Sequence, residues 1–162
     1  MRARSLVATL GLFAVLAPAA HSEVTVVFVE PQHYTDGGEG GYRYDRSTLN
    51  TLERHLKTLG GRCLKEGETL VLRVLDVDLA GRYEWWRRAG YDVRVMRDIT
   101  WPRLDLEYVW RDASGRVLGQ ARERVSDMSY LWRSPYVRND LDPLPYEKAM
   151  LRDWFDRRFC RG

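Results

Sequence analysis

The sequence predicts an α+β fold in which a mixed, mainly antiparallel sheet of four to five strands carries two helices on one face. Two observations predict it. Segments of helical periodicity lie near both ends of the chain, and between them runs a series of segments with the residue alternation of strands. Consecutive strands of this kind pair with one another, and the helices on either side of the run pack on one face of the resulting sheet. We therefore expect this layout and not the alternating strand–helix order of nucleotide-binding folds.

The N-terminal part of the predicted domain supplies one strand and the first helix. Residues 23–31, EVTVVFVEP, are rich in β-branched residues and stop at a proline, which is typical of a strand. From Asp45 onward, leucines recur at positions 49, 52, 56 and 59, which is the spacing of one helical face. We expect an amphipathic helix here, closed by Gly60 and Gly61.

The middle of the chain predicts the rest of the sheet. Residues 69–79, TLVLRVLDVDL, are apolar on both alternating faces and are expected at the centre of the sheet. Residues 92–99 and 101–111 alternate apolar and polar side chains. The turn sequence DASG at 112–115 then predicts an antiparallel hairpin with residues 116–126.

The C-terminal segment predicts the second helix and, with it, a disulfide. Residues 146–159 carry a wide apolar stripe that includes Trp154 and Phe155. The two cysteines, Cys63 and Cys160, follow the two helices, and both helices are expected on the same face of the sheet. In an oxidising compartment a pair of cysteines is more often bridged than free, so we expect a disulfide and no metal site.

The first residues have the layout of a secretion signal. Arg2 and Arg4 precede an apolar run, residues 6–16, that is shorter than a membrane-spanning helix requires, and small residues follow it. We expect residues 1–22 to be a cleaved signal peptide and residues 23–162 to form a single α+β domain. The predicted location is the periplasm, with no integral membrane segment after cleavage.

The charge balance of the expected mature chain excludes one class of partner. Removing residues 1–22 takes away two arginines and no acidic residue, which leaves 24 basic against 23 acidic residues. Nucleic-acid binding needs a basic face or stripe, which a nearly balanced chain does not indicate. We therefore do not expect nucleic acid as a partner.

Four stretches carry a resemblance to a known family: VLDVDLAG at 74–81, DVRVMRDITWPR at 92–103, VSDMSYL at 125–131 and YEKAMLRDWFDRRF at 146–159. Together they resemble the exported bacterial family known as domain of unknown function 3016. The resemblance spans nearly all of the expected mature chain and implies no reaction. The order of elements is also similar to that of small envelope domains in transport-auxiliary and lipopolysaccharide-assembly lipoproteins, which favours a binding or assembly role by analogy of layout.

Asp76 and Asp78 form a candidate carboxylate pair. They are two residues apart on a predicted strand, so their side chains should project to the same face near the end of that strand. Paired carboxylates can bind a cation, or one can act as a general acid and the other as a general base. The alternative is that these acids face solvent or an arginine, and arginine is plentiful in this chain.

A second candidate surface lies where the predicted hairpin ends. Trp101 and Arg103 open one strand, and Asp127 follows the other, so we expect an Arg103–Asp127 salt bridge at a polar corner that clamps the loop or lines a ligand cleft. Aromatic rings and arginines follow in the proline-bounded segment, and they suit a glycan or protein interface as well as packing under a loop. They are Tyr130, Trp132, Arg133, Tyr136 and Arg138.

No catalytic residues are assigned from motifs. No serine lies in a GxSxG elbow, neither histidine of the expected mature chain has the spacing of a known catalytic pair, and no cofactor-binding motif is present. The sequence favours a periplasmic binding or assembly accessory of the cell envelope, with an envelope protein or glycan as its partner. The alternative is a small envelope hydrolase that uses Asp76, Asp78 and Asp127.

Overall fold

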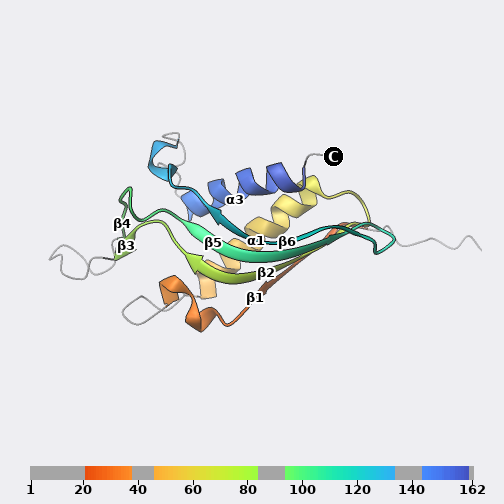
Figure 1. The fold of residues 1–162 in the computed structure, drawn as a ribbon, viewed down its shortest axis with the longest axis horizontal. Helices are drawn as coiled ribbons and strands as arrows, with labels where there is room; N and C mark the ends of the chain where they lie inside the picture. The colour runs from red at the N-terminus through yellow and green to blue at the C-terminus, as the bar shows by residue number, and fades with distance from the viewer. Residues whose placement is uncertain (1–20, 38–45, 84–93, 134–143, 161–162) are drawn as a thin grey trace, which may run out of the picture.

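The computed structural model describes residues 21–37, 46–83, 94–133 and 144–160. A sheet of order β1-β2-β5-β6 forms one layer, and two helices form a second layer on one of its faces (Figure 1). The predicted α+β class is therefore confirmed. The sheet strands are β1 (Glu23–Phe28), β2 (Thr69–Asp78), β5 (Arg103–Arg111) and β6 (Val117–Ser126), and the helices are α1 (Arg46–Cys63) and α3 (Pro145–Arg158).

The pairing of the strands follows from the connections between them. Helix α1 carries the chain from β1 to β2, and these two strands are parallel; β5 is antiparallel to both β2 and β6. Strand β2 is central, as predicted. The β5–β6 hairpin also forms as predicted, and its turn is held by Asp112, whose Oδ1 accepts the backbone N–H groups of Ser114 and Arg116 at 2.9 and 3.0 Å.

The core lies between the sheet and the helices. Strand alternation sends every second residue of β2 and β5 toward the helices, where Leu72 and Leu106 are fully buried. The predicted leucine stripe of α1 and the apolar stripe of α3 meet them. Fully buried members of this core include Leu52, Leu56, Leu70, Val74, Leu104, Leu151 and Phe155.

The predicted end of the first helix is wrong. Helix α1 continues through Gly60 and Gly61 and ends at Cys63. A Cβ at position 60 would lie 2.0 Å from Val24 Cγ2 of β1, a distance that real Cβ atoms do not reach. Gly60 is therefore needed for the close approach of α1 to β1, and not to close the helix.

The predicted strand at 92–99 is also wrong in extent and place. Among the described residues of this range, 94–99, only Arg94–Val95 form a strand, β4, and it pairs with β3 (Arg82–Tyr83) in a separate two-stranded sheet; residues 84–93 lie outside the described residues. The alternation stops because Arg97 and Thr100 make a turn, in which the Thr100 N–H donates to the Arg97 carbonyl at 3.0 Å.

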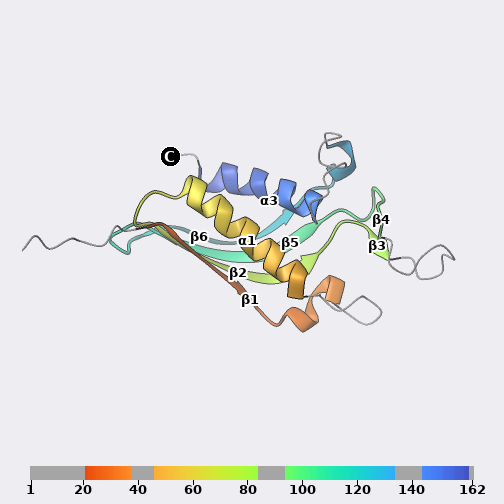
Figure 2. The same cartoon turned by 180° about the vertical axis from the view of Figure 1, so that it is seen from behind.

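The two helices are joined at one end of the molecule. Cys63 at the end of α1 and Cys160 after α3 form the predicted disulfide, with 4.5 Å between their Cα atoms. Figure 2 shows this end from behind, opposite the end that holds β3 and β4. The predicted signal peptide falls almost wholly on residues 1–20, which are outside the described residues. In the described part of the chain, no helix combines the length and apolar character that crossing a bilayer requires.

Candidate functional site

The exit of β2, residues 79–81, is held by side chains from three distant segments. The backbone N–H of Leu79 donates to Asp36 Oδ2 at 3.0 Å, and the N–H of Ala80 donates to Glu147 Oε1 at 2.7 Å. Asp36 comes from the turn after β1, and Glu147 comes from the first turn of α3. The two carboxylates thus satisfy two backbone donors where the chain leaves the sheet.

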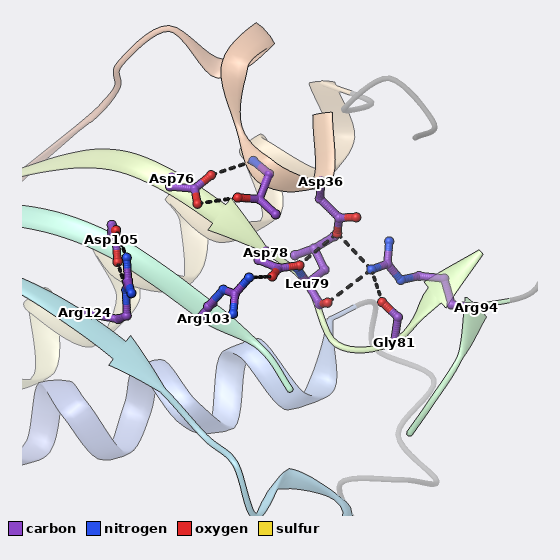
Figure 3. A network of polar contacts seen from close by, with 10 residues as sticks. Asp36, Asp76, Asp78, Leu79, Gly81, Arg94, Arg103, Asp105 and Arg124 are labelled. Carbon is purple, nitrogen blue, oxygen red and sulfur yellow. Dashed lines mark hydrogen bonds and ion pairs between the residues drawn. The ribbon is translucent and has the colours of Figure 1, made fainter. Parts of the chain in front are cut away.

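Arg94 of β4 satisfies the carbonyl groups of the same segment. Its Nη2 donates to the Leu79 and Gly81 carbonyls at 3.2 and 2.6 Å, and its Nε donates to the Ala80 carbonyl at 3.0 Å. The same Nη2 lies 2.8 Å from Asp36 Oδ2 (Figure 3). Asp36, Arg94 and Glu147 with residues 79–81 form the exit cluster.

Two carboxyl groups near the exit of β2, those of Glu147 and Asp78, are buried. Burial raises the pKa of Glu147, whose residue is only 2% exposed; the hydrogen bond from Ala80 and the positive charge of Arg94 oppose this rise but are weaker. Burial also raises the pKa of Asp78, against the effect of Arg103. A carboxyl group whose pKa is raised by burial can serve as a general acid. In Glu147, however, one carboxylate oxygen accepts the hydrogen bond from the Ala80 N–H and so has a structural role.

Asp76 and Asp78 lie on the face of the sheet that the helices do not cover, and each has its own partner. Asp76 accepts hydrogen bonds from the N–H and the Oγ1 of Thr35, both at 2.6 Å. Asp78 pairs with Arg103 at 2.6 Å (Figure 3). The two carboxylates are thus separately partnered and are not left as an open pair.

The predicted Arg103–Asp127 salt bridge is wrong. Arg103 lies opposite Ser126 in the β5–β6 ladder, and side chains alternate along a strand. Asp127, one residue further, therefore turns to the helix side, where it accepts from Arg133; the same guanidinium donates to Asp153 of α3 at 2.8 Å. Arg103 stays on the open face, so the polar corner does not form.

The same geometry removes the basis for hydrolysis by clustered carboxylates. Asp76 and Asp78 are on the open face, whereas Asp127 is on the helix side and two strands away. In the described ranges, one group of three metal-ligating side chains comes together, Cys63, Asp156 and Cys160. Its two sulfur atoms are bonded to each other in the disulfide and so are not thiolate ligands.

Tyr130 is a core residue and not part of an exposed ring surface. Its residue is fully buried, its ring packs edge-on against Tyr146 with 4.9 Å between centroids, and its hydroxyl donates to the Arg97 carbonyl at 2.7 Å. Trp101 is partly buried against the same small cluster, which also contains Ala80. The prediction of a ligand surface at these two rings is therefore replaced by a second, smaller core.

Trp132 behaves in the opposite way, since it is 90% exposed. Two further large apolar side chains are exposed at this end of the molecule, Met128 at 67% and Ile99 at 71%. The hydrogen bond from Tyr130 to Arg97 ties their two segments together. We refer to these three exposed side chains, Ile99, Met128 and Trp132, as the end patch. Tyr136 and Arg138 lie outside the described residues.

Several residues of this region had no sequence signal. Asp36 and Glu147 are 43 and 67 residues from the backbone groups that they bind, and Arg94 is 58 residues from Asp36. A single charged residue in a turn or helix is unremarkable by itself. Ile99 and Met128 could have been noticed as large apolar residues in a turn or irregular segment.

Comparison with known proteins places the chain in a family. The model of the family of proteins of unknown function DUF3016 matches residues 22–157. The chain belongs to this family. No curated protein matches it. A crystal structure of a minor lipoprotein from Acinetobacter baumannii aligns over 85% of this chain and 88% of that one, with 11% identity and a TM-score of 0.25, too low to support an inference.

Proposed function

We propose that this DUF3016 protein is exported to the periplasm and acts there as a binding or assembly accessory of the cell envelope, docking a partner through the end patch. The observation that carries the proposal is the exposure of Ile99, Met128 and Trp132, three large apolar side chains at one end of the molecule. Single exposed apolar residues are ordinary, whereas a group of them is typical of an interaction surface.

The end patch has the composition of a protein-binding surface. Tryptophan provides a large rigid contact area and is enriched among the residues that dominate binding energy. Methionine adapts its shape to irregular surfaces. Ile99 and Met128 offer a sugar no strong hydrogen bond, so we favour an envelope protein over a glycan as the partner.

The base of the patch is rigid, which lowers the entropic cost of docking. Arg133, next to Trp132, bonds to both Asp127 and Asp153, and Tyr130 anchors the preceding turn to Arg97. Trp132 is thus presented on a segment that is already fixed to α3 and to the turn after β4.

Export is supported by two observations. The first residues have the pattern of a secretion signal, and the disulfide between Cys63 and Cys160 is typical of an oxidising compartment. Intact-mass measurement of the protein recovered from a periplasmic fraction should give a chain that begins near Glu23. A chain that still begins at Met1 and sediments with membranes would contradict this part of the proposal.

The docking surface is tested by photocrosslinking in the exported protein. A photoreactive phenylalanine analogue placed at Trp132 should yield an adduct with an envelope protein. The matched control is the same analogue at Leu118, which is 40% exposed at the opposite end of the molecule. Equal adducts from both positions, or none from position 132, would overturn the proposed docking surface.

A further inference from the structure

Strand β6 is an open edge of the sheet. It is 10 residues long and pairs with β5 on its inner side. In the part of the chain that the structure describes, no hydrogen bond from another segment reaches the backbone of β6 on its outer side. An edge strand of this kind offers a row of N–H and C=O groups that match one kind of occupant, another extended chain.

A groove runs along this edge under α3. It has a volume of about 390 Å³ and lies between residues 123–126 of β6 and three residues of α3, Trp154, Arg157 and Arg158. Glu123 links the two walls of the groove, because its carboxylate on β6 accepts a hydrogen bond from Trp154 Nε1 of α3 at 2.9 Å and pairs with Arg158 Nη2 of α3 at 2.8 Å. The groove is therefore preformed beside the free edge.

The charges along the edge leave a positive surplus. Glu123 is neutralised by Arg158, and Arg124 pairs with Asp105 of β5 through two hydrogen bonds of 2.6 and 2.7 Å. Arg122 and Arg157 are both exposed, and neither has a hydrogen bond or ion pair within the described segments. Arg122 lies opposite Glu107 in the β5–β6 ladder and so projects to the open face of the sheet, whereas Arg157 is on the helix side and lines the groove. An occupant that carries carboxylates on both of its faces would find one available guanidinium group on each side of the edge.

We propose that β6 receives an extended acidic peptide segment of a partner protein as an added strand, with carboxylates on one face directed to Arg122 and carboxylates on the other face directed to Arg157. A second copy of this chain suits the edge less well. Two β6 strands edge to edge would gather Arg122 and Arg124 of both copies along one short junction, and like charges on neighbouring strands are destabilising. This site is separate from the end patch and goes beyond the proposed function.

The test uses a synthetic peptide with blocked ends, as long as β6, in which pairs of glutamates alternate with pairs of threonines, so that carboxylates project to both faces of the added strand. Titration into the purified, disulfide-bonded protein should shift the NMR signals of β6 and of the groove and slow the exchange of the outer amides of β6. Arg122→Glu with Arg157→Glu should weaken binding by roughly tenfold at a temperature where this variant is folded. Arg122 lies opposite Glu107, so its change to an acid also lowers the melting temperature. The matched control is Arg152→Glu, which changes an exposed arginine of α3 that does not line the groove. This variant should bind the peptide as tightly as the wild type.

Two variants of the peptide separate strand addition from simple charge attraction. A peptide methylated at alternate backbone nitrogens keeps its carboxylates but cannot pair with an edge, and it should not bind. A peptide with lysine in place of glutamate should not bind either. Equal binding of the methylated peptide, equal loss in Arg152→Glu and in the double variant, or no binding of the acidic peptide would each overturn the proposal. None of these results depends on Trp132, so they leave the proposed function to its own test.

Discussion

The exit cluster and the end patch lie at the same end of the molecule and use their residues in opposite ways. In the exit cluster, charged side chains are turned inward and bound to backbone groups, as Arg94 is to three carbonyls. In the end patch, the apolar Trp132 is turned outward and is 90% exposed. Residue type alone would predict exposed charges and a buried ring, whereas here the charges hold the backbone and Trp132 is exposed.

Loss of the disulfide at the opposite end of the molecule is expected to have the largest effect on stability. It closes a loop between residues 97 positions apart, and a loop of that size contributes about 4 to 5 kcal/mol in the chain-entropy model. The double variant Cys63→Ser with Cys160→Ser should therefore lower the free energy of unfolding more than any change at the other end. Denaturant unfolding of both proteins measures it. A loss as small as that of an ordinary surface substitution would show that the disulfide does not constrain the unfolded chain.

Arg94→Met should be the most damaging single change in the exit cluster. It removes the donor for the carbonyls of residues 79–81 and leaves Asp36 without its cation, at a cost of about 3 kcal/mol. Thermal and urea unfolding measure the loss. The matched control, Arg152→Met, removes an exposed arginine and should change stability by less than about 0.5 kcal/mol. Equal effects of the two changes would mean that the exit cluster does not hold the fold.

Glu147 makes stability depend on pH in a defined direction. Burial raises its pKa above the ordinary value of 4.5, so the folded protein keeps a proton that the unfolded chain has released. The stability from this proton is present at low pH and is lost as the pH rises through the raised pKa. Glu147→Gln does not titrate and keeps an acceptor for the Ala80 N–H.

The free energy of unfolding of the wild type minus that of Glu147→Gln should therefore fall as the pH rises above 4.5, by up to about 1.4 kcal/mol per pH unit. Urea titrations at a series of pH values give this difference. A difference that rises with pH would show that the pKa of Glu147 is lowered by its hydrogen bonds and not raised by burial.

Arg103 should be coupled to Asp78 and not to Asp127. Arg103→Ala removes a partner from a carboxylate whose side chain is 11% exposed, and we expect a loss of about 1 kcal/mol at neutral pH. A double-mutant cycle with Asp78→Asn should recover most of this loss as coupling energy, and a cycle with Asp127→Asn should show none. The reverse pattern would restore the salt bridge that the sequence predicted.

The sequence was a good guide where the signal is local or periodic. The leucine spacing of α1, the alternation of β5 and the DASG turn each report on the chain within a few residues, and the predicted elements formed there. The disulfide followed because both helices lie on one face of the sheet. These predictions needed no knowledge of which distant side chains meet.

Two of the errors depended on spatial relations that only the three-dimensional structure defines. Arg103 and Asp127 are near each other along the hairpin, but a shift of one residue places them on opposite faces. Gly60 has the residue type of a helix end, but its role is set by contact with Val24 on β1. The exit cluster depends on contacts over as many as 67 residues, for which a single sequence carries no signal.

The most direct test of the account compares partner capture with stability in two variants. Trp132→Ala should leave the free energy of unfolding within about 0.5 kcal/mol of the wild type, because the side chain is 90% exposed, and should abolish capture of the partner found by crosslinking. Arg94→Met should lose stability but retain capture per folded molecule, and Leu118→Ala should change neither. Full capture by Trp132→Ala, or loss of capture in Arg94→Met at a temperature where it is folded, would contradict the division between a binding patch and a structural cluster.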